Sequence, residues 1–136
     1  MYALALAMAL IASQNTQQFD LVCSGTMSSN LFGGRFHIPE RTSPWTQTYR
    51  IDLENGLWCK DTCTSVLPII EATTGSLVLM KTEDDGFVIR INRVTGKVFD
   101  SLRHAVEPAS GGGTIVISSE GPCERKDFTP FPRSMF

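Results

Sequence analysis

Short segments of alternating apolar and polar residues, separated by turn signals about every ten residues, constrain this chain most strongly. In the clearest case Tyr49, Ile51 and Leu53 point one way and the charged residues between them point the other way. A period of two residues is typical of a half-buried β-strand. The pair Asn55-Gly56 follows, and an Asn-Gly pair between apolar runs predicts a hairpin because both turn positions need a positive φ.

The same pattern recurs along most of the chain and predicts about eight strands, with no helix longer than a turn or two. Turn pairs ending in glycine separate several of the segments. Pro68 lies inside one segment and cannot donate to a ladder, so that segment should be an edge strand or contain a bulge. The expected strands cover residues 19–26, 48–54, 57–60, 66–72, 76–82, 87–94, 97–104 and 114–120.

Eight short strands with one apolar face must bury that face in an up-and-down barrel or in a sandwich of two sheets. The central links are tight turns, which favours an all-β fold, a single antiparallel meander that closes into a small barrel. The longest link, residues 27–45, could cross between two sheets, so a β-sandwich remains the alternative. An eight-stranded barrel is narrow enough for side chains to fill, so we expect a packed interior rather than a cavity.

The apolar run from Met1 to Ala12 is too short to span a bilayer, but it has the length of a signal-peptide core. Small residues stand at the end of the run, where a signal peptidase could cut. No Lys or Arg precedes Arg35, whereas a signal peptide normally begins with positive charge. An Ala-rich first helix is therefore the alternative. We expect residues 1–13 to be a signal peptide and residues 14–136 a single β-barrel-like domain. Such a protein would be periplasmic or secreted, with no membrane span.

Four cysteines, an even number, predict two disulfides in an oxidising compartment, although they allow three connectivities. The spacing fits neither a zinc site nor a C-x-x-C redox motif. In a closed meander the first strand lies beside the last, which would pair Cys23 with Cys123 and leave Cys59 for Cys63. On one extended strand the latter two would be about 13 Å apart, so they can pair only if the chain curls between them.

Composition and charge exclude some functions. The 136 residues suffice for one domain, and 12 basic against 14 acidic residues lack the positive charge that nucleic-acid binding needs. After the last cysteine, Pro130 and Pro132 interrupt regular structure, so we expect residues 124–136 to form an extended tail over the barrel.

Residues that could carry chemistry are few. The two histidines, His37 and His104, stand in no recognisable catalytic motif, even with Asp100 near the second one. We therefore expect no catalytic residue, no metal site and no cofactor. The candidates for contact with a ligand or partner are two arginines and a histidine of the long link together with both tryptophans, that is Arg35, His37, Arg41, Trp45 and Trp58.

The stretches "FDLVCSGT", "YRIDLENGLWC", "INRVTG" and "GPC" resemble small exported proteins of Gram-negative bacteria that have no assigned function. The resemblance covers residues 19–123 and implies a small exported β-domain, because its motifs are structural and include no active site. In architecture alone the chain is also similar to periplasmic lysozyme inhibitors.

These observations favour a monomeric, extracytoplasmic, disulfide-stabilised β-domain that acts as a non-catalytic protein-binding or inhibitory module. Its partner would be an envelope or extracellular protein. A lipocalin-like carrier of a small apolar ligand is the second hypothesis, and an enzyme is the third.

Overall fold

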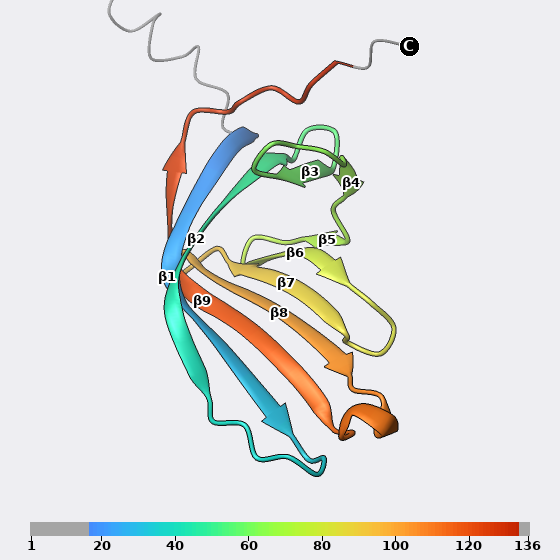
Figure 1. Ribbon diagram of the computed structural model, residues 1–136. Helices are drawn as coiled ribbons and strands as arrows, with labels where there is room; N and C mark the ends of the chain where they lie inside the picture. The colour runs from blue at the N-terminus through green and yellow to red at the C-terminus, as the bar shows by residue number, and fades with distance from the viewer. Residues whose placement is uncertain (1–16, 134–136) are drawn as a thin grey trace, which may run out of the picture.

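The computed structural model describes residues 17–133, which form nine antiparallel strands and one short 3-10 helix (Figure 1). The all-β prediction is therefore confirmed, whereas the expected signal peptide, residues 1–13, lies outside the described residues. The elements are β1 (Gln18–Phe32), β2 (Arg41–Asp52), β3 (Leu57–Lys60), β4 (Leu67–Pro68), β5 (Glu71–Ala72), β6 (Ser76–Lys81), β7 (Phe87–Asn92), β8 (Lys97–Ala105), η1 (Pro108–Ser110) and β9 (Thr114–Lys126).

The strands form one sheet in the order β4-β3-β2-β1-β9-β8-β7-β6-β5, which curls into a half-barrel (Figure 1). The first strand pairs with the last, as an up-and-down meander requires. The sandwich alternative is wrong, because the long link 27–45 is mostly strand: β1 extends to Phe32, β2 starts at Arg41, and the two pair as a hairpin.

The sequence predicted residues 66–72 as one strand, but within this stretch the chain changes its pairing partner. The chain bends there, so that β4 pairs with β3 and β5 pairs with β6. On either side of the bend the Ile69 amide donates to the Gly56 carbonyl at 2.8 Å and the Ile70 amide donates to the Val78 carbonyl at 2.9 Å. The strand that contains Pro68 is thus a terminal strand of the sheet, as expected. Because β4 and β5 do not pair with each other, the half-barrel stays open here and only the bent segment connects its two ends.

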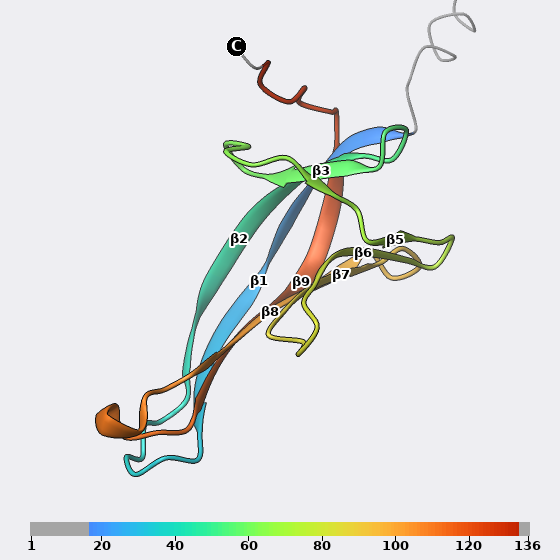
Figure 2. The same ribbon diagram turned by 90° about the vertical axis from the view of Figure 1, so that its right-hand side faces the viewer.

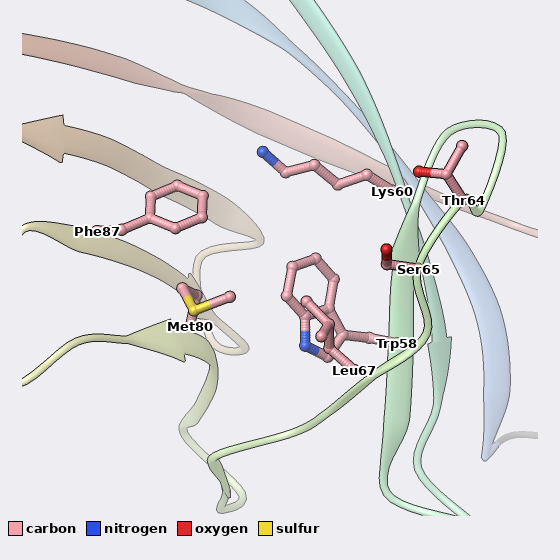
Figure 3. A pocket seen from close by; sticks show the side chains of 7 residues that line it. All are labelled: Trp58, Lys60, Thr64, Ser65, Leu67, Met80 and Phe87. Atoms are coloured by element: carbon pink, nitrogen blue, oxygen red, sulfur yellow. The ribbon is translucent and has the colours of Figure 1, made fainter.

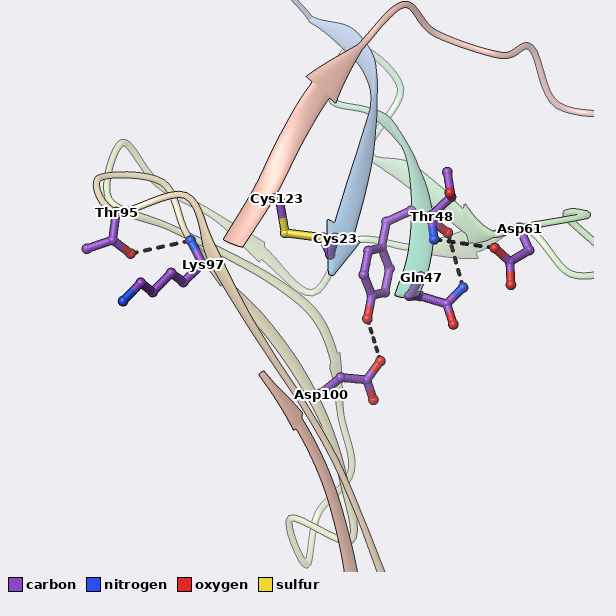
Figure 4. The surroundings of a disulfide bond; sticks show 9 residues. Cys23, Gln47, Thr48, Asp61, Thr95, Lys97, Asp100 and Cys123 are labelled. Atoms are coloured by element: carbon purple, nitrogen blue, oxygen red, sulfur yellow. Dashed lines mark hydrogen bonds between the residues drawn. A yellow bond between two sulfur atoms is a disulfide. The ribbon is translucent and has the colours of Figure 1, made fainter. Parts of the chain in front are cut away.

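The β1–β9 pair closes the meander and brings two backbones unusually close. Cys23 and Cys123 are register partners and form a disulfide, which Figure 4 shows. Two residues further on, a Cβ added to Gly25 would lie 1.8 Å from the Glu120 carbonyl oxygen. A Cβ added to Gly121 would lie 2.0 Å from the Ser24 carbonyl oxygen. Only glycine permits this approach of two strands.

Side chains fill the interior of the half-barrel, as expected for a barrel of this size. Tyr49 and Ile51 of β2 enter it at 0% exposure, and Trp58 of β3 at 2%. The cluster also includes Phe19, Cys23, Leu77, Leu79, Ile89, Ile91 and Val98. The alternating pattern of β2 therefore points its apolar face inward, as the sequence predicted.

Beyond the glycine pair, β1, β2, β8 and β9 continue as a single layer, here called the arm (Figure 2). The arm comprises residues 26–32, 41–44, 101–105 and 114–120. Most of its side chains are exposed or half-buried. In the described part of the chain no second layer covers either face of the arm (Figure 2).

The segment after β3 curls, as its cysteine pair requires. Cys59 and Cys63 form the second disulfide with their Cα atoms 5.0 Å apart. The Cys63 amide donates to the Lys60 carbonyl at 2.7 Å, and the Asp61 amide donates to the Thr48 carbonyl of β2 at 2.9 Å. The curl is therefore fastened both to its own strand and to the neighbouring one.

The C-terminal tail starts later than expected. β9 extends to Lys126, which pairs with Asp20, so the extended segment begins at Asp127 rather than at residue 124. The buried Asp20 carboxylate accepts hydrogen bonds from the Thr129 amide at 3.1 Å and the Thr129 hydroxyl at 2.6 Å. This pair fixes the tail to the start of β1.

Because the two backbones approach so closely at Gly25, adding one methyl group there should strongly reduce the stability of the fold. Gly25→Ala should lower the free energy of unfolding by about 3 kcal/mol, because the added Cβ meets backbone that cannot move aside alone. Gly75→Ala is the matched control, since nothing lies within 4 Å of its Cβ position. Urea denaturation of the oxidised proteins measures both changes, and equal stability of the two variants would contradict this account of the β1–β9 pair.

Candidate functional site

The tip of the arm consists of two loops, residues 33–40 and 106–113, that bind each other. The Arg35 amide donates to the Gly111 carbonyl at 2.8 Å, and the Arg35 guanidinium donates to the Pro108 carbonyl at 3.0 Å. Gly34 has φ +79° and packs so closely that a Cβ would lie 2.6 Å from the Gly112 carbonyl oxygen. One backbone hydrogen bond and one side-chain hydrogen bond of Arg35 thus join the two loops of the tip.

Large apolar side chains stand exposed at this tip. Phe32 is 59% exposed, Phe36 62% and Ile38 49%. Single exposed apolar residues are ordinary, but several together on one loop usually mark an interaction surface. The tip is therefore the first candidate site, and these three residues were not among those chosen from the sequence.

The arm connects the tip to the core by an apolar strip. Met27 and Leu31 of β1 share a face with Cys23, because side chains alternate along a strand. Across the ladder Leu31 pairs with Ile115 of β9, and the next residue on that face of β9 is Ile117. All four are half-buried. They lie on the same face of the sheet as Cys23, which belongs to the core of the half-barrel.

The residues predicted to contact a ligand or partner fall into separate places. Arg35 and His37 lie in the tip loop and Arg41 starts β2 beside it, all three exposed. Trp45 is half-buried against the core cluster. Trp58 lies in the core, far along the sheet from the tip, so it belongs to a second site.

That second site is a pocket of about 180 Å³ on the side where the half-barrel is open, between β3 with its curl and the β6–β7 hairpin (Figure 3). Its walls combine four apolar side chains with two hydroxyls and one ammonium group. They are Trp58, Leu67, Met80, Phe87, Thr64, Ser65 and Lys60.

The Trp58 indole is a polar group without a partner in this wall. Its Nε1 is buried and has no hydrogen-bond acceptor, unlike every other buried side-chain nitrogen or oxygen of residues 17–133. In Figure 3 the edge that carries this nitrogen faces the Met80 side of the opening. A buried donor without an acceptor is costly and calls for an explanation.

The Lys60 ammonium group lies at the edge of the pocket in a fixed position. It is 3.1 Å from the Asp100 carboxylate and lies over the rings of Phe87, at 5.4 Å, and Tyr49, at 5.8 Å. Asp100 also accepts a hydrogen bond from the Tyr49 hydroxyl (Figure 4). The three polar groups join β2, β3 and β8 across the inside of the half-barrel.

Burial raises the pKa of the Tyr49 hydroxyl far above its ordinary value, and the charge of Asp100 and its hydrogen bond raise it further. Tyr49 therefore remains a protonated donor to Asp100 throughout the physiological range. The Tyr49 residue is 0% exposed, so solvent does not reach its hydroxyl. The cluster therefore positions side chains and does not present the hydroxyl as a base.

The histidine and aspartate considered from the sequence as a catalytic pair lie apart in the described part of the chain. His104 and Asp100 stand four residues apart on β8, about 13 Å along a strand, too far for a hydrogen bond. Between residues 17 and 133 no three His, Cys, Asp or Glu side chains gather to hold a metal ion. The same residues include no helix long and apolar enough to cross a membrane.

No protein-family model, curated protein or solved structure matches this chain.

The Tyr49 environment predicts how stability depends on pH. Because the folded-state pKa is raised, the contribution of Tyr49 is fully present below the unfolded pKa of 10.0 and is lost as the pH rises above it. The unfolding free energy of the wild type should therefore fall above pH 10.0, and Tyr49→Phe should show a shallower fall. At neutral pH the variant should be less stable by about 1.5 kcal/mol through loss of the bond to Asp100.

Urea denaturation between pH 7 and 11 measures both effects. Parallel curves would contradict the burial of an ionisable hydroxyl at this position.

Proposed function

We propose that this chain is an extracytoplasmic, non-catalytic protein-binding module that contacts its partner through the tip of the arm. The observation that carries the proposal is the exposure of Phe32, Phe36 and Ile38 at the end of β1 and in the loop 33–40, which hydrogen bonds of Arg35 fasten to the loop 106–113. A rigid tip loses little conformational entropy on binding, and aromatic side chains contribute much of the energy of protein interfaces.

The cysteines support the location. All four form disulfides, which suggests a non-reducing, extracytoplasmic compartment. Export through a signal peptide at residues 1–13, a periplasmic or secreted destination and kinship with small exported proteins of Gram-negative bacteria are parts of the same proposal. An inhibitory action of the kind known for periplasmic lysozyme inhibitors belongs to it as well.

The polar groups of the tip suit the edge of an interface. Arg41 and His37 are exposed beside the three apolar residues, while Arg35 is held at the Pro108 carbonyl. Interfaces typically place apolar anchors at the centre and polar groups at the rim. The tip provides both within one hairpin, and the apolar strip of the arm extends the surface toward the core.

A lipocalin-like carrier has weaker support. Such carriers hold their ligand inside the barrel, but here Tyr49, Ile51 and Trp58 and their neighbours occupy the interior. The pocket beside Trp58 is too small for a lipid or other large ligand.

Site-specific photo-crosslinking tests the proposal. A photoreactive amino acid at position 36 should crosslink to one protein of the envelope or the secreted fraction of the source organism. The same group at Val94, an 83% exposed apolar residue in the β7–β8 turn, is the control and should not crosslink to that protein.

The protein identified in this way is then purified for a binding assay. The triple change of Phe32, Phe36 and Ile38 to serine should weaken its binding at least about a hundredfold, as loss of interface anchors does. Val94→Ser should leave the affinity unchanged. Equal crosslinking at both positions, or an unaffected affinity in the triple variant, would refute the tip as the contact surface.

A further inference from the structure

The pocket beside Trp58 is separate from the arm and is not used by the proposed protein contact. It lies at the place where the half-barrel fails to close, because residues 67–72 join β3 to β6 only at the bend. Its volume of about 180 Å³ is close to that of engineered cavities that bind benzene-sized molecules. A small ligand fits this space, whereas a lipid does not.

The walls specify an apolar body. Leu67 and Met80 face the indole from β4 and β6, and the Phe87 ring stands on the far side of the opening (Figure 3). A water molecule needs two to four polar partners to be held in such a space. The indole nitrogen is itself buried, so a water molecule in the open part of the pocket does not reach it.

The buried indole N–H specifies one polar atom. Trp58 is 2% exposed, and its Nε1 has no acceptor in the described part of the chain. An unsatisfied donor costs about 1–3 kcal/mol, which an acceptor on a ligand would recover. A ketone, ester or ether oxygen meets this need when the flexible Met80 side chain moves aside, because the nitrogen itself is closed off from the open space of the pocket.

The charge of the site favours a neutral molecule. Lys60 is the only cation in the wall, and the carboxylate of Asp100 lies 3.1 Å from it. The ammonium group is further stabilised by the faces of Phe87 and Tyr49. Little net charge remains to attract an anion, and Lys60 already occupies the aromatic faces that would attract a cation.

We propose that this pocket binds a small, neutral, mainly apolar molecule whose oxygen accepts a hydrogen bond from Trp58 Nε1–H. The binding site is independent of the tip. It is formed by the open side of the half-barrel. Trp58 donates the hydrogen bond to the ligand, and its indole N–H signal also reports binding.

Three probes of equal size separate the parts of this proposal. Acetophenone has an acceptor, isopropylbenzene has none, and benzoate carries a charge. The chain has two tryptophans, so Trp45→Phe assigns the indole signals in the nitrogen-15 spectrum of the oxidised protein. Acetophenone should bind saturably and shift the Trp58 indole proton downfield while the Trp45 signal stays in place.

Affinities are compared through the methyl signal of Met80, which lies in the same wall. Isopropylbenzene should bind about tenfold more weakly than acetophenone, the equivalent of one hydrogen bond. Trp58→Phe keeps an apolar wall without the donor and should abolish that difference. Benzoate should bind more weakly than acetophenone, and Asp100→Asn should strengthen benzoate binding by leaving Lys60 uncompensated.

Ser65→Phe fills the pocket from its exposed rim and should prevent acetophenone binding. Thr62→Phe adds the same side chain to the same curl outside the pocket wall and should not. Absence of saturable binding to the wild type would overturn the site. Equal affinity for acetophenone and isopropylbenzene, with an unmoved indole signal, would overturn the role of Trp58.

Discussion

The pairing of β1 with β9 is the constraint on which the rest of the structure depends. It joins the two ends of the meander across 100 residues of chain, and the Cys23–Cys123 disulfide makes the join covalent. A disulfide that closes a loop of that length lowers the entropy of the unfolded chain and so stabilises the folded state by about 4.7 kcal/mol. The bond between Cys59 and Cys63 closes a much shorter loop and contributes about 2 kcal/mol. The glycines beside the bond, Gly25 and Gly121, let the two backbones approach where the sheet leaves the barrel for the arm.

Both candidate sites arise from places where the barrel is incomplete. Below the glycine pair the four central strands continue without a second layer, and they end in a tip whose aromatic residues remain exposed. On the opposite side of the ring the bend at residues 67–72 leaves an opening beside Trp58. The packed interior between them fixes the position of each site, since Tyr49, Lys60 and Asp100 link three strands there.

The sequence predicted what local patterns encode. The alternation around Ile51 and the Asn55-Gly56 turn identified the β2–β3 hairpin, and the idea of a meander led to both disulfides. It predicted the arm segments of β8 and β9 as strands but not those of β1 and β2, because the exposed residues 41–44 of the long link show no apolar alternation. The bend at Pro68, the pairing of Lys60 with Asp100 and the unpartnered Trp58 nitrogen depend on contacts distant in sequence. Phe32 and Phe36, flanking two glycines, were the one local signal of the tip, and exposure alone distinguishes them from core residues.

Peptide mapping of the unreduced protein tests the central claim most directly. Digestion of the oxidised chain without prior reduction, followed by mass spectrometry, identifies which cysteine-containing peptides are linked. The account predicts one linked pair that joins the Cys23 peptide to the Cys123 peptide, and a Cys59–Cys63 bond within the segment that follows β3. A bond from Cys23 to either Cys59 or Cys63, or free thiols at positions 23 and 123, would contradict the closure of the meander through β1 and β9.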